Sequence, residues 1–567
     1  MDSHAVNLSY ASGASDQPLI GLPISQFFDN VVARYGEREA VVSCHQGIRW
    51  TYAQLAERVN QLARAFIAAG FVKGDRVGIW SPNNVEWLCT QYATAKVGIV
   101  LVTINPAYRT HELAYVLKQA GCKGLVIQNS FKSSDYIAML TELCPELATA
   151  KAGALSSADF PLLTTVVSNT ASEVAGIHDW AEFRAAGDKV CAQTLAACVD
   201  EQDMDDPINI QYTSGTTGFP KGATLSHHNI LNNGRFVAAI MQFSERDRLV
   251  IPVPLYHCFG MVMGNLGCLS HGACAIYPSE GFEPEAVLAA IEAEKATALF
   301  GVPTMFIAEL GLPMFNNFDL SSLRTGIMAG APCPVETMKQ VNDLMHMTEV
   351  EIAYGMTETS PVSFQSRVDS PLDKRVSTVG RVHPHVEVKI IDPDTGRTCT
   401  VGTMGELCTR GYSVMLGYWE NPDATAAAID SDGWMHTGDT AIMDVEGYVN
   451  IVGRIKDMIV RGGENVYPRE IEEFLMTHPA IDAVQVTGVP DIKFGEEIVA
   501  WINIKEDAQL SEAEIKSYCD GQIAHFKVPR YIRFSTEFPM TVTGKVQKFK
   551  MREISMQELG LQDTKTA

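Results

Sequence analysis

The sequence has no pair of cysteines with Cys-x-x-Cys spacing, although it contains 13 cysteines in 567 residues. An odd number of scattered cysteines fits neither a zinc site nor a disulfide framework, and it predicts reduced thiols, several of them in the core. Basic residues are also scarce, because 44 Lys and Arg stand against 67 Asp and Glu, for a net charge of −23. This balance argues against nucleic acid as the main partner, since a phosphate backbone requires a basic footprint.

Several common nucleotide-binding and hydrolase motifs are absent. No two glycines are separated by a single residue, so Gly-x-Gly-x-x-Gly occurs nowhere, and no Walker A sequence is present. A dinucleotide-binding Rossmann fold and a protein kinase therefore lose their main support. The Gly-x-Ser-x-Gly and His-Glu-x-x-His motifs are missing as well.

The N-terminal region lacks the features of a targeting segment, because its first basic residue is Arg34. We therefore expect a cytoplasmic protein.

Residues 249–279 contain no Asp, Glu, Lys or Arg, and a run of this length could cross a bilayer. Pro252, Pro254 and several glycines and histidines interrupt it. The run is therefore predicted to be a buried strand, loop and helix rather than a transmembrane segment.

Hydrophobic periodicity predicts an α/β arrangement in the first two thirds of the chain. Residues 51–70 have helical spacing, with Thr51 and Gln54 as a capping box. Apolar runs that alternate with helical stretches predict sheets with both faces covered. These runs are Val77–Trp80, Val97–Thr103, Leu125–Gln128, Ala296–Pro303, Leu323–Ala329 and Val350–Tyr354.

The pattern changes after about residue 380 and again after Arg454. Short alternating runs at 386–391 and 448–452 predict antiparallel strands. A helix from Pro468, strands at 483–489 and 498–504, and a helix capped by Ser511 then predict a small α+β unit. We therefore place a domain boundary near Lys456, which gives domains of residues 1–455 and 456–567.

The stretch from Thr213 to Gly222 has four hydroxyl residues, three glycines and one lysine in ten positions. Glycine lets backbone N–H groups approach an anion closely. The hydroxyl groups add hydrogen-bond donors, and Lys221 adds a positive charge. The composition therefore favours a polyphosphate-binding loop over a flexible surface turn.

This loop resembles the first signature of the adenylate-forming superfamily. That superfamily contains acyl-CoA synthetases, aryl-CoA ligases, firefly-type luciferases and peptide-synthetase adenylation domains. Further stretches are similar to its other motifs and occur in the same order, namely Tyr354–Glu358, Thr437–Asp439, Gly453–Asp457, Arg461–Pro468 and Thr543–Lys545. Within the superfamily, the chain looks most like medium-chain fatty acyl-CoA synthetases.

The resemblance implies a mixed α/β and α+β fold. A large N-terminal domain would hold α/β sheets and a β-barrel-like subdomain. A small C-terminal α+β domain would move as a lid about a hinge at Lys456. The resemblance covers nearly the whole chain.

The resemblance also implies ATP, Mg²⁺ and CoA as the molecules bound. The loop that would surround the β- and γ-phosphates consists of Thr213, Ser214, Gly215, Thr216, Thr217, Gly218 and Lys221. The adenine pocket would be formed by Gly330, Ala331, Pro332, Tyr354, Gly355 and Met356. Asp439 would accept hydrogen bonds from the ribose hydroxyls, and Arg454 would contact ribose or phosphate.

Several residues acquire catalytic roles from the same resemblance. Glu358 would bind Mg²⁺, and Thr357 would contact the α-phosphate. Lys545 would neutralise the charge that develops during adenylation, and His257 would stand beside the substrate carboxylate. After the C-terminal domain rotates, a second set of residues would help form the pantetheine tunnel, namely Gly462, Gly463 and Glu464.

The implied reaction joins a carboxylic acid to AMP with release of pyrophosphate, and then transfers the acyl group to CoA. A mainly apolar region at 253–260, with Gly264, Gly301, Val302 and Met328, fits an alkyl or aryl chain. Together with the resemblance, it predicts an unbranched or lightly substituted fatty acid of medium length. Four alternatives stay open at this point: an aryl-CoA ligase, an acyl-AMP ligase that loads a carrier protein, a luciferase-like oxidase, and a nucleotide-binding regulator without turnover. A homodimer is also left open.

Overall fold

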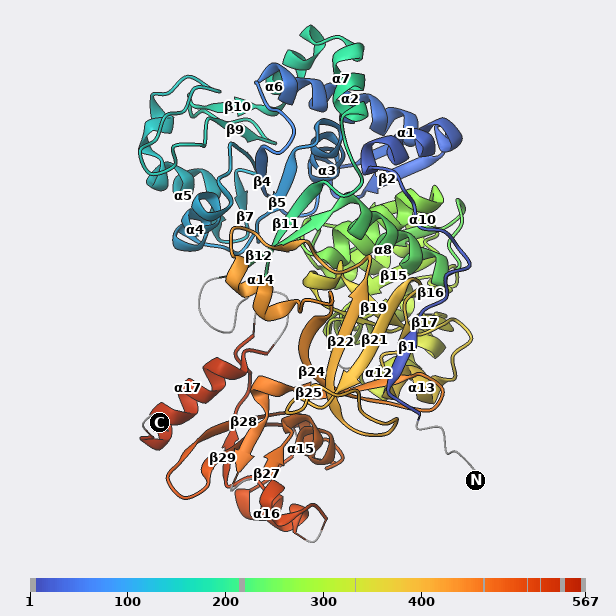
Figure 1. The fold of residues 1–567 in the computed structure, drawn as a ribbon, viewed down its shortest axis with the longest axis vertical. Helices are drawn as coiled ribbons and strands as arrows, with labels where there is room; N and C mark the ends of the chain where they lie inside the picture. Colours follow the sequence, from blue (N-terminus) through green and yellow to red (C-terminus); the bar gives the residue numbers. More distant parts are fainter. Residues whose placement is uncertain are drawn as a thin grey trace. The chain divides into compact units, whose positions relative to one another are not determined.

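The computed structural model describes residues 7–213, 220–331, 333–461, 464–506, 508–520, 522–540 and 546–561. The chain divides into two compact units, whose elements are labelled in Figure 1. The larger unit contains Ser12–Glu387 and Thr409–Met435, and the smaller unit contains Met1–Ala11, Val388–Cys408 and His436–Ala567. The boundary predicted near Lys456 lies inside the smaller unit and stays a prediction.

The first sheet of the larger unit has eight strands. Its strands from β10 to β11 pair in parallel, whereas β12 pairs antiparallel with both β11 and β23. Strands β4 and β6 confirm the runs predicted at Val77–Trp80 and Leu125–Gln128. In sheet order the strands are β10 (Ile177–Asp179), β9 (Thr165–Ser168), β6 (Gly124–Ile127), β4 (Arg76–Trp80), β5 (Val100–Thr103), β11 (Pro207–Thr213), β12 (Lys221–Ser226) and β23 (Gly417–Tyr418).

The second sheet of the larger unit has seven strands. All neighbours pair in parallel except β2 and β3, which form an antiparallel pair. In sheet order the strands are β17 (Glu349–Glu351), β16 (Thr325–Met328), β15 (Ala298–Gly301), β13 (Arg248–Val250), β14 (Cys274–Tyr277), β2 (Glu39–Ser43) and β3 (Ile48–Thr51). Smaller sheets contain β18 (Ala353–Gly355), β19 (Val362–Gln365) and β20 (Arg381–Val382), and the pair β7 (Ser130–Phe131) and β8 (Ser134–Asp135).

Two sequence-based strand predictions were wrong in their bounds. The run Val97–Thr103 starts the strand too early, because Val97 ends a helix and Gly98 follows it at a φ of +77°. The single strand predicted at 350–354 is two strands, β17 and β18, in different sheets. The chain leaves the first of these sheets at Ile352, whose N–H donates to the Ser366 hydroxyl and whose carbonyl accepts from the Ser366 N–H.

Helix α2 of the larger unit carries the capping box that the sequence predicted. At the start of α2, the Thr51 hydroxyl accepts from the Gln54 N–H, and the Gln54 side chain accepts from the Thr51 N–H. The helices are α1 (Ile24–Tyr35), α2 (Tyr52–Ala68), α3 (Val85–Val97), α4 (Thr110–Ala120), α5 (Tyr136–Leu143), α6 (Trp180–Ala186), α7 (Ala192–Asp200), α8 (His227–Ile240), α9 (Gly267–His271), α10 (Pro284–Glu294), α11 (Pro303–Leu310), α12 (Val335–Leu344), α13 (Leu372–Ser377) and α14 (Pro422–Ala428).

The uncharged run at 249–279 forms the centre of the larger unit. It contains β13, a π-helical segment at Phe259–Leu266, α9 and β14, and nearly all of it is buried. Its polar groups bond to neighbouring elements, as where the Tyr277 hydroxyl and the Gln91 side chain both contact the Asn265 amide. The prediction of a buried strand, loop and helix is confirmed. Among the described residues, no helix is long and apolar enough to cross a membrane.

The smaller unit contains two sheets. The first contains the antiparallel strands predicted at 386–391 and 448–452, and the second belongs to the same unit as α15, α16 and α17 (Figure 1). The first sheet has the order β1 (Tyr10–Ser12), β21 (Val386–Ile391), β22 (Gly405–Gly411), β24 (Met435–Met443) and β25 (Val449–Arg454). The second has β27 (Glu464–Val466), β26 (Ile459–Arg461), β29 (Gly495–Ile504) and β28 (Ile481–Asp491), with β30 (Tyr531–Phe534) paired to β29. The helices are α15 (Pro468–Leu475), α16 (Glu512–Cys519) and α17 (Lys548–Leu559).

Candidate active site

The candidate site of the larger unit lies at the carboxyl ends of its parallel strands, where open α/β sheets bind their ligands. Strands β13, β15, β16 and β17 end at or just before four segments that contain residues predicted from the sequence to bind substrate or nucleotide. The Ala329 N–H donates to the Gly301 carbonyl at 3.2 Å, so the ends of two of these strands lie side by side. The four segments are 251–260, 301–302, 329–331 and 352–358.

Polar side chains from the eight-stranded sheet reach the same loop at 253–258. Asn83 follows β4, and its amide donates to the Val253 carbonyl at 3.0 Å and accepts from the Leu255 N–H at 2.8 Å. Gln211 lies on β11, and its side-chain oxygen accepts from the Cys258 thiol at 3.0 Å. The carboxyl ends of β4, β11 and β13 therefore meet around this loop.

The phosphate-binding candidate lies at the hairpin between β11 and β12. Thr213 and Lys221 are paired across the two strands, and the Thr213 hydroxyl donates to the Lys221 carbonyl at 3.4 Å. The predicted residues between them, Ser214, Gly215, Thr216, Thr217 and Gly218, lie outside the described residues. Pro220 is anchored because its carbonyl accepts from the Tyr115 hydroxyl at 3.1 Å. The two ends of the loop are thus fixed opposite each other.

Tyr418 links the predicted cation to the predicted metal ligand. Its hydroxyl donates to Glu358 Oε1 at 2.8 Å, and Lys221 Nζ lies 5.0 Å from the centre of its ring. Glu358 is only 5% exposed, and its carbonyl accepts from the Met415 N–H. The Glu358 charge also contributes, after burial, to raising the pKa of the Cys258 thiol. Lys221, Glu358 and the loop that contains His257 are therefore neighbours.

The adenine candidates lie around the ends of β16 and β18. Tyr354 is half-buried, with its ring 6.1 Å from that of Phe364. At Gly355 a Cβ atom would come within 1.7 Å of the Pro361 carbonyl oxygen, so no other residue fits there. Met356 and Thr357 are half-buried beside them, whereas Gly330 and Ala331 are exposed. Pro332 lies outside the described residues.

His257 is half-buried next to an apolar region. Its Nδ1 accepts from the Phe259 N–H at 3.2 Å, which places the proton of the neutral ring on Nε2. The neighbouring Tyr256 hydroxyl is buried without a hydrogen-bond partner among the described residues, and burial raises its pKa. Phe259 and Phe300 contact each other at 5.2 Å between ring centres. An unpaired Tyr256 hydroxyl beside aromatic side chains suits a ligand with one polar end and an apolar chain.

The ribose candidates lie within the smaller unit. Asp439 and Arg454 are paired across β24 and β25, and Arg454 Nε lies 3.2 Å from Asp439 Oδ1. Within β24, Gly438 has a φ of +69°, and this local turn of the strand is held by the Thr437 hydroxyl. That hydroxyl donates to the Leu407 carbonyl at 2.7 Å and accepts from the Asp439 N–H at 3.1 Å. The predicted ribose-binding pair is therefore brought together, on a firmly bonded turn.

The remaining predicted residues follow Lys456 in the chain. Gly462, Gly463 and Lys545 lie outside the described residues. Glu464 is exposed and is paired in β27 with Arg461 of β26. Arg461 is anchored by the buried Glu497 at 2.7 Å. The basic residues near Lys545 have acidic partners, since Lys548 bonds to Glu472 and Arg552 to Glu496.

Sequence reasoning missed three side chains that position this site, namely Asn83, Gln211 and Tyr418. Asn83 carried a signal, because it is a polar residue directly after a predicted buried strand. Gln211 lies two residues before the predicted phosphate loop. Tyr418 carried no local signal, since its contact with Glu358 joins residues 60 apart in the chain.

Comparison with known proteins identifies the family to which the chain belongs. Residues 28–419 match the family of AMP-binding enzymes, and residues 470–545 match the AMP-binding enzyme C-terminal domain. The chain is 49% identical to "Putative acyl-CoA synthetase YngI" of Bacillus subtilis, over 96% of this chain and 99% of the relative. It is 47% identical to the medium-chain acyl-CoA ligase ACSF2, mitochondrial, of Danio rerio, over 98% and 91%. The crystal structure of ATP-bound MatB from Rhodopseudomonas palustris is similar with a TM-score of 0.80 and 29% identity, over 94% and 99% of the two chains.

Proposed function

The chain belongs to the AMP-binding enzyme family, and from this premise we propose that it is an ATP-dependent acid:CoA ligase for medium-chain fatty acids. It would activate the acid as an acyl-adenylate and then form the acyl-CoA, with release of pyrophosphate and AMP. The observation that carries the proposal is the contact of Tyr418 with both Lys221 and Glu358 beside the loop at 213–221.

Glu358 fits the role of a magnesium ligand. Mg²⁺ prefers oxygen ligands and binds through one or two carboxylates together with substrate phosphates. Glu358 offers such a carboxylate, buried and held by a neutral phenol rather than by a cation. When bound, Mg²⁺ would neutralise part of the triphosphate charge.

In the first half-reaction, the carboxylate of the acid attacks the α-phosphorus of ATP and pyrophosphate leaves. Lys221 and the backbone of the loop would hold the β- and γ-phosphates, and Thr357 would contact the α-phosphate. Lys545 would balance the charge that accumulates between the acid and the α-phosphate. Fixed donors and cations of this kind stabilise a transition state because they need no reorganisation as the charge develops.

In the second half-reaction, the CoA thiol attacks the acyl carbonyl and AMP leaves. The two steps need different surroundings for the same carbonyl carbon. We propose that the segment after Lys456 rotates between the steps, so that Lys545 leaves and Gly462, Gly463 and Glu464 enter. Asp439 and Arg454 would hold the ribose of the nucleotide in both states.

The acid would lie along the apolar region near His257. Val253, Phe259 and Phe300 are buried there, and no carboxylate of this loop could pair an amino-acid ammonium. At Gly264 a Cβ atom would come within 2.8 Å of Ile251, so this glycine leaves room for close packing. An alkyl chain suits these surroundings, and several relatives are named medium-chain acyl-CoA ligases.

A panel of acids tests the proposal. The full-length protein is supplied with ATP, Mg²⁺ and CoA, and AMP formation is measured with fatty acids of increasing length, benzoate, cinnamate and amino acids. We expect the highest kcat/KM with octanoate and its neighbours in length. A preference for the aromatic acids would favour an aryl-CoA ligase. AMP formation with a carrier protein but not with CoA would favour a carrier-loading ligase.

The cytoplasm and a homodimer are the location and assembly that we propose for the chain. Cell fractionation tests the location, and recovery in a mitochondrial or membrane fraction would contradict it. Sedimentation equilibrium tests the assembly, and a single species of 61.9 kDa would contradict the dimer.

A further inference from the structure

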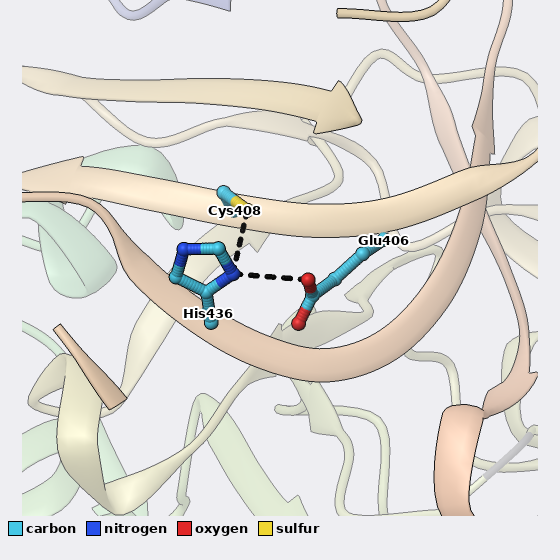
Figure 2. A group of neighbouring side chains, drawn as sticks. All are labelled: Glu406, Cys408 and His436. Atoms are coloured by element: carbon cyan, nitrogen blue, oxygen red, sulfur yellow. Dashed lines mark hydrogen bonds and ion pairs between the residues drawn. The ribbon is translucent and has the colours of Figure 1, made fainter. Parts of the chain in front are cut away.

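A cluster of three metal-ligating side chains lies beside the turn that holds Asp439. Glu406 and Cys408 are two residues apart on β22, so both side chains point to the same face of the strand. His436 faces them from β24, as Figure 2 shows. His436 Nδ1 lies 2.9 Å from Glu406 Oε2 and 3.7 Å from Cys408 Sγ, and the three ligand atoms all lie within 4.8 Å of one another.

The two distances from His436 Nδ1 are close to the edges of a zinc tetrahedron. Zinc binds nitrogen and oxygen at about 2.0–2.1 Å and thiolate sulfur at about 2.3 Å, so a tetrahedral site separates nitrogen from sulfur by roughly 3.6 Å and nitrogen from oxygen by roughly 3.3 Å. The nitrogen–sulfur distance already matches. The nitrogen–oxygen distance must open by a few tenths of an ångström, which a glutamate side chain allows.

We propose that Glu406, Cys408 and His436 form a binding site for a borderline-soft divalent cation, with Zn²⁺ as the best match. A nitrogen, sulfur and oxygen donor set suits zinc, whereas Mg²⁺ and Ca²⁺ require oxygen ligands. On binding, the Cys408 thiol loses its proton to solvent, the single ring proton of a neutral His436 resides on Nε2, and bonds from sulfur and Nδ1 to the cation form. The site is separate from Glu358, which would bind Mg²⁺ in the larger unit.

The exposure of the three side chains differs, so that solvent can reach the site from one side only. Cys408 is fully buried, while the side chains of Glu406 and His436 are 12% and 32% exposed. The cation therefore reaches the cluster from the histidine side, and water completes its coordination there. Three protein ligands with one open position are typical of exchangeable zinc rather than of a closed structural site.

Metal binding at this cluster has a consequence for the neighbouring turn. Glu406 Oε1 accepts from the Gly438 N–H at 3.2 Å, while Oε2 faces His436. Gly438 has a φ of +69°, so the turn depends on a conformation that favours glycine. A cation that draws Glu406 away weakens this bond and moves Asp439. This consequence, a lower affinity for ATP, rests on the proposed function of Asp439, whereas cation binding itself does not.

A cobalt titration of the full-length protein tests the site. Co²⁺ reports coordination through its visible absorption and through a charge-transfer band that requires a thiolate ligand. We expect one Co²⁺ per chain with the thiolate band, lost on addition of Zn²⁺. Cys408→Ser should lose the band, and His436→Asn should weaken binding by about tenfold or more. The matched control is Cys399→Ser, another buried cysteine of the same unit, which should bind as the unchanged protein does.

Two results would overturn the site: no thiolate band in the unchanged protein, or the same band in Cys408→Ser. Near-ultraviolet circular dichroism of each variant shows whether it is folded, and Glu406→Gln gives a second ligand variant if Cys408→Ser is not. The titration contains no nucleotide, so its outcome is independent of the ligase activity. In a separate arm, Zn²⁺ should raise the KM for ATP of the unchanged protein and leave that of Cys408→Ser unchanged. Equal KM values with and without bound Zn²⁺ would refute the coupling to Asp439.

Discussion

Glu358 in the larger unit and Asp439 in the smaller unit are both buried carboxylates, but their partners differ. Glu358 accepts a hydrogen bond from the neutral Tyr418 hydroxyl. The Lys221 ammonium contacts the ring of Tyr418 instead of the Glu358 carboxylate. Asp439 is paired directly with Arg454, whose side chain is 51% exposed. The first arrangement leaves the full charge of the carboxylate available to a cation. The second is a solvent-screened ion pair of little net stability, which ribose hydroxyls can replace.

The largest expected effect on activity comes from substitution of Lys545, which belongs to neither the Glu358 nor the Asp439 arrangement. Lys545→Ala should lower the rate of acyl-adenylate formation by about 10²–10³-fold, because a cation aimed at the developing charge is lost. Acid-dependent ATP–pyrophosphate exchange measures this step. Transfer from preformed acyl-adenylate to CoA should be nearly unchanged. Lys550→Ala is the control, since Lys550 is an exposed lysine of the neighbouring helix α17.

Glu358→Gln should break the first arrangement by removing charge without changing shape. We expect kcat for adenylation to fall by about 10²-fold, and saturation to require far more Mg²⁺, because a neutral amide is a poor magnesium ligand. A Mg²⁺ titration of pyrophosphate release makes the measurement. An unchanged Mg²⁺ dependence would show that another group binds the cation.

Asp439→Asn should disrupt the ion pair with Arg454. Its effect on activity should be smaller than that of Glu358→Gln and should appear in the KM for ATP rather than in kcat. The hydrogen bonds from the ribose to a charged acceptor become bonds to a neutral one, and the KM for ATP should rise by about tenfold. Steady-state kinetics with varied ATP separate KM from kcat. A fall in kcat with an unchanged KM would place Asp439 in the chemical step instead.

Tyr418→Phe sharpens the comparison, because it removes the hydroxyl and keeps the ring beneath Lys221. Loss of one hydrogen bond to a charged group should lower kcat/KM by about threefold to tenfold and raise the Mg²⁺ concentration for half-saturation. Tyr412→Phe is the matched control, because Tyr412 is a half-buried tyrosine of the same unit, as Tyr418 is, and its hydroxyl contacts Asn233 rather than Glu358. Equal Mg²⁺ dependence in the two variants would contradict a positioning role for Tyr418.

Glu351 is a buried carboxylate that, among the described residues, has neither a tyrosine donor, as Glu358 has, nor a directly paired arginine, as Asp439 has. It is fully buried, and burial raises its pKa to about 8, while the hydrogen bond from Gln365 acts in the opposite direction. The folded protein therefore keeps this proton at pH values where the unfolded chain has lost it, so stability falls as pH rises from about 4.5 to about 8. Glu351→Gln should remove this part of the fall with little change in activity.

Urea denaturation of the unchanged protein and of Glu351→Gln at pH 5 and pH 9 measures this difference. The loss of unfolding free energy between the two pH values should be smaller in the variant. An equal loss in both proteins would mean that Glu351 does not carry a raised pKa.

The sequence predicted the elements that depend on local patterns. Helix α2 with its Thr51 cap, the strands β4 and β6, and the helix starting at Pro468 all follow from periodicity and end signals. The break at Ile352 could not be predicted in this way, because Ser366, a residue from a later segment, draws the chain into another sheet.

The candidate site shows the same division. Thr213, Lys221, Asp439 and Arg454 were identified from their motifs, and the structure pairs them as two couples across neighbouring strands. Tyr418 and the Glu406–Cys408–His436 cluster were missed. Cysteine spacing argued against a zinc site, because that rule considers cysteine pairs along the chain and not ligands joined by two adjacent strands.

Transfer of an oxygen isotope tests the proposed acyl-adenylate most directly. The full-length protein is given octanoate labelled with ¹⁸O in its carboxylate, together with ATP, Mg²⁺ and CoA, and the products are analysed by mass spectrometry. Because the carboxylate attacks the α-phosphorus, one labelled oxygen should appear in AMP and none in pyrophosphate. Unlabelled AMP, or labelled inorganic phosphate together with ADP, would contradict an acyl-adenylate intermediate.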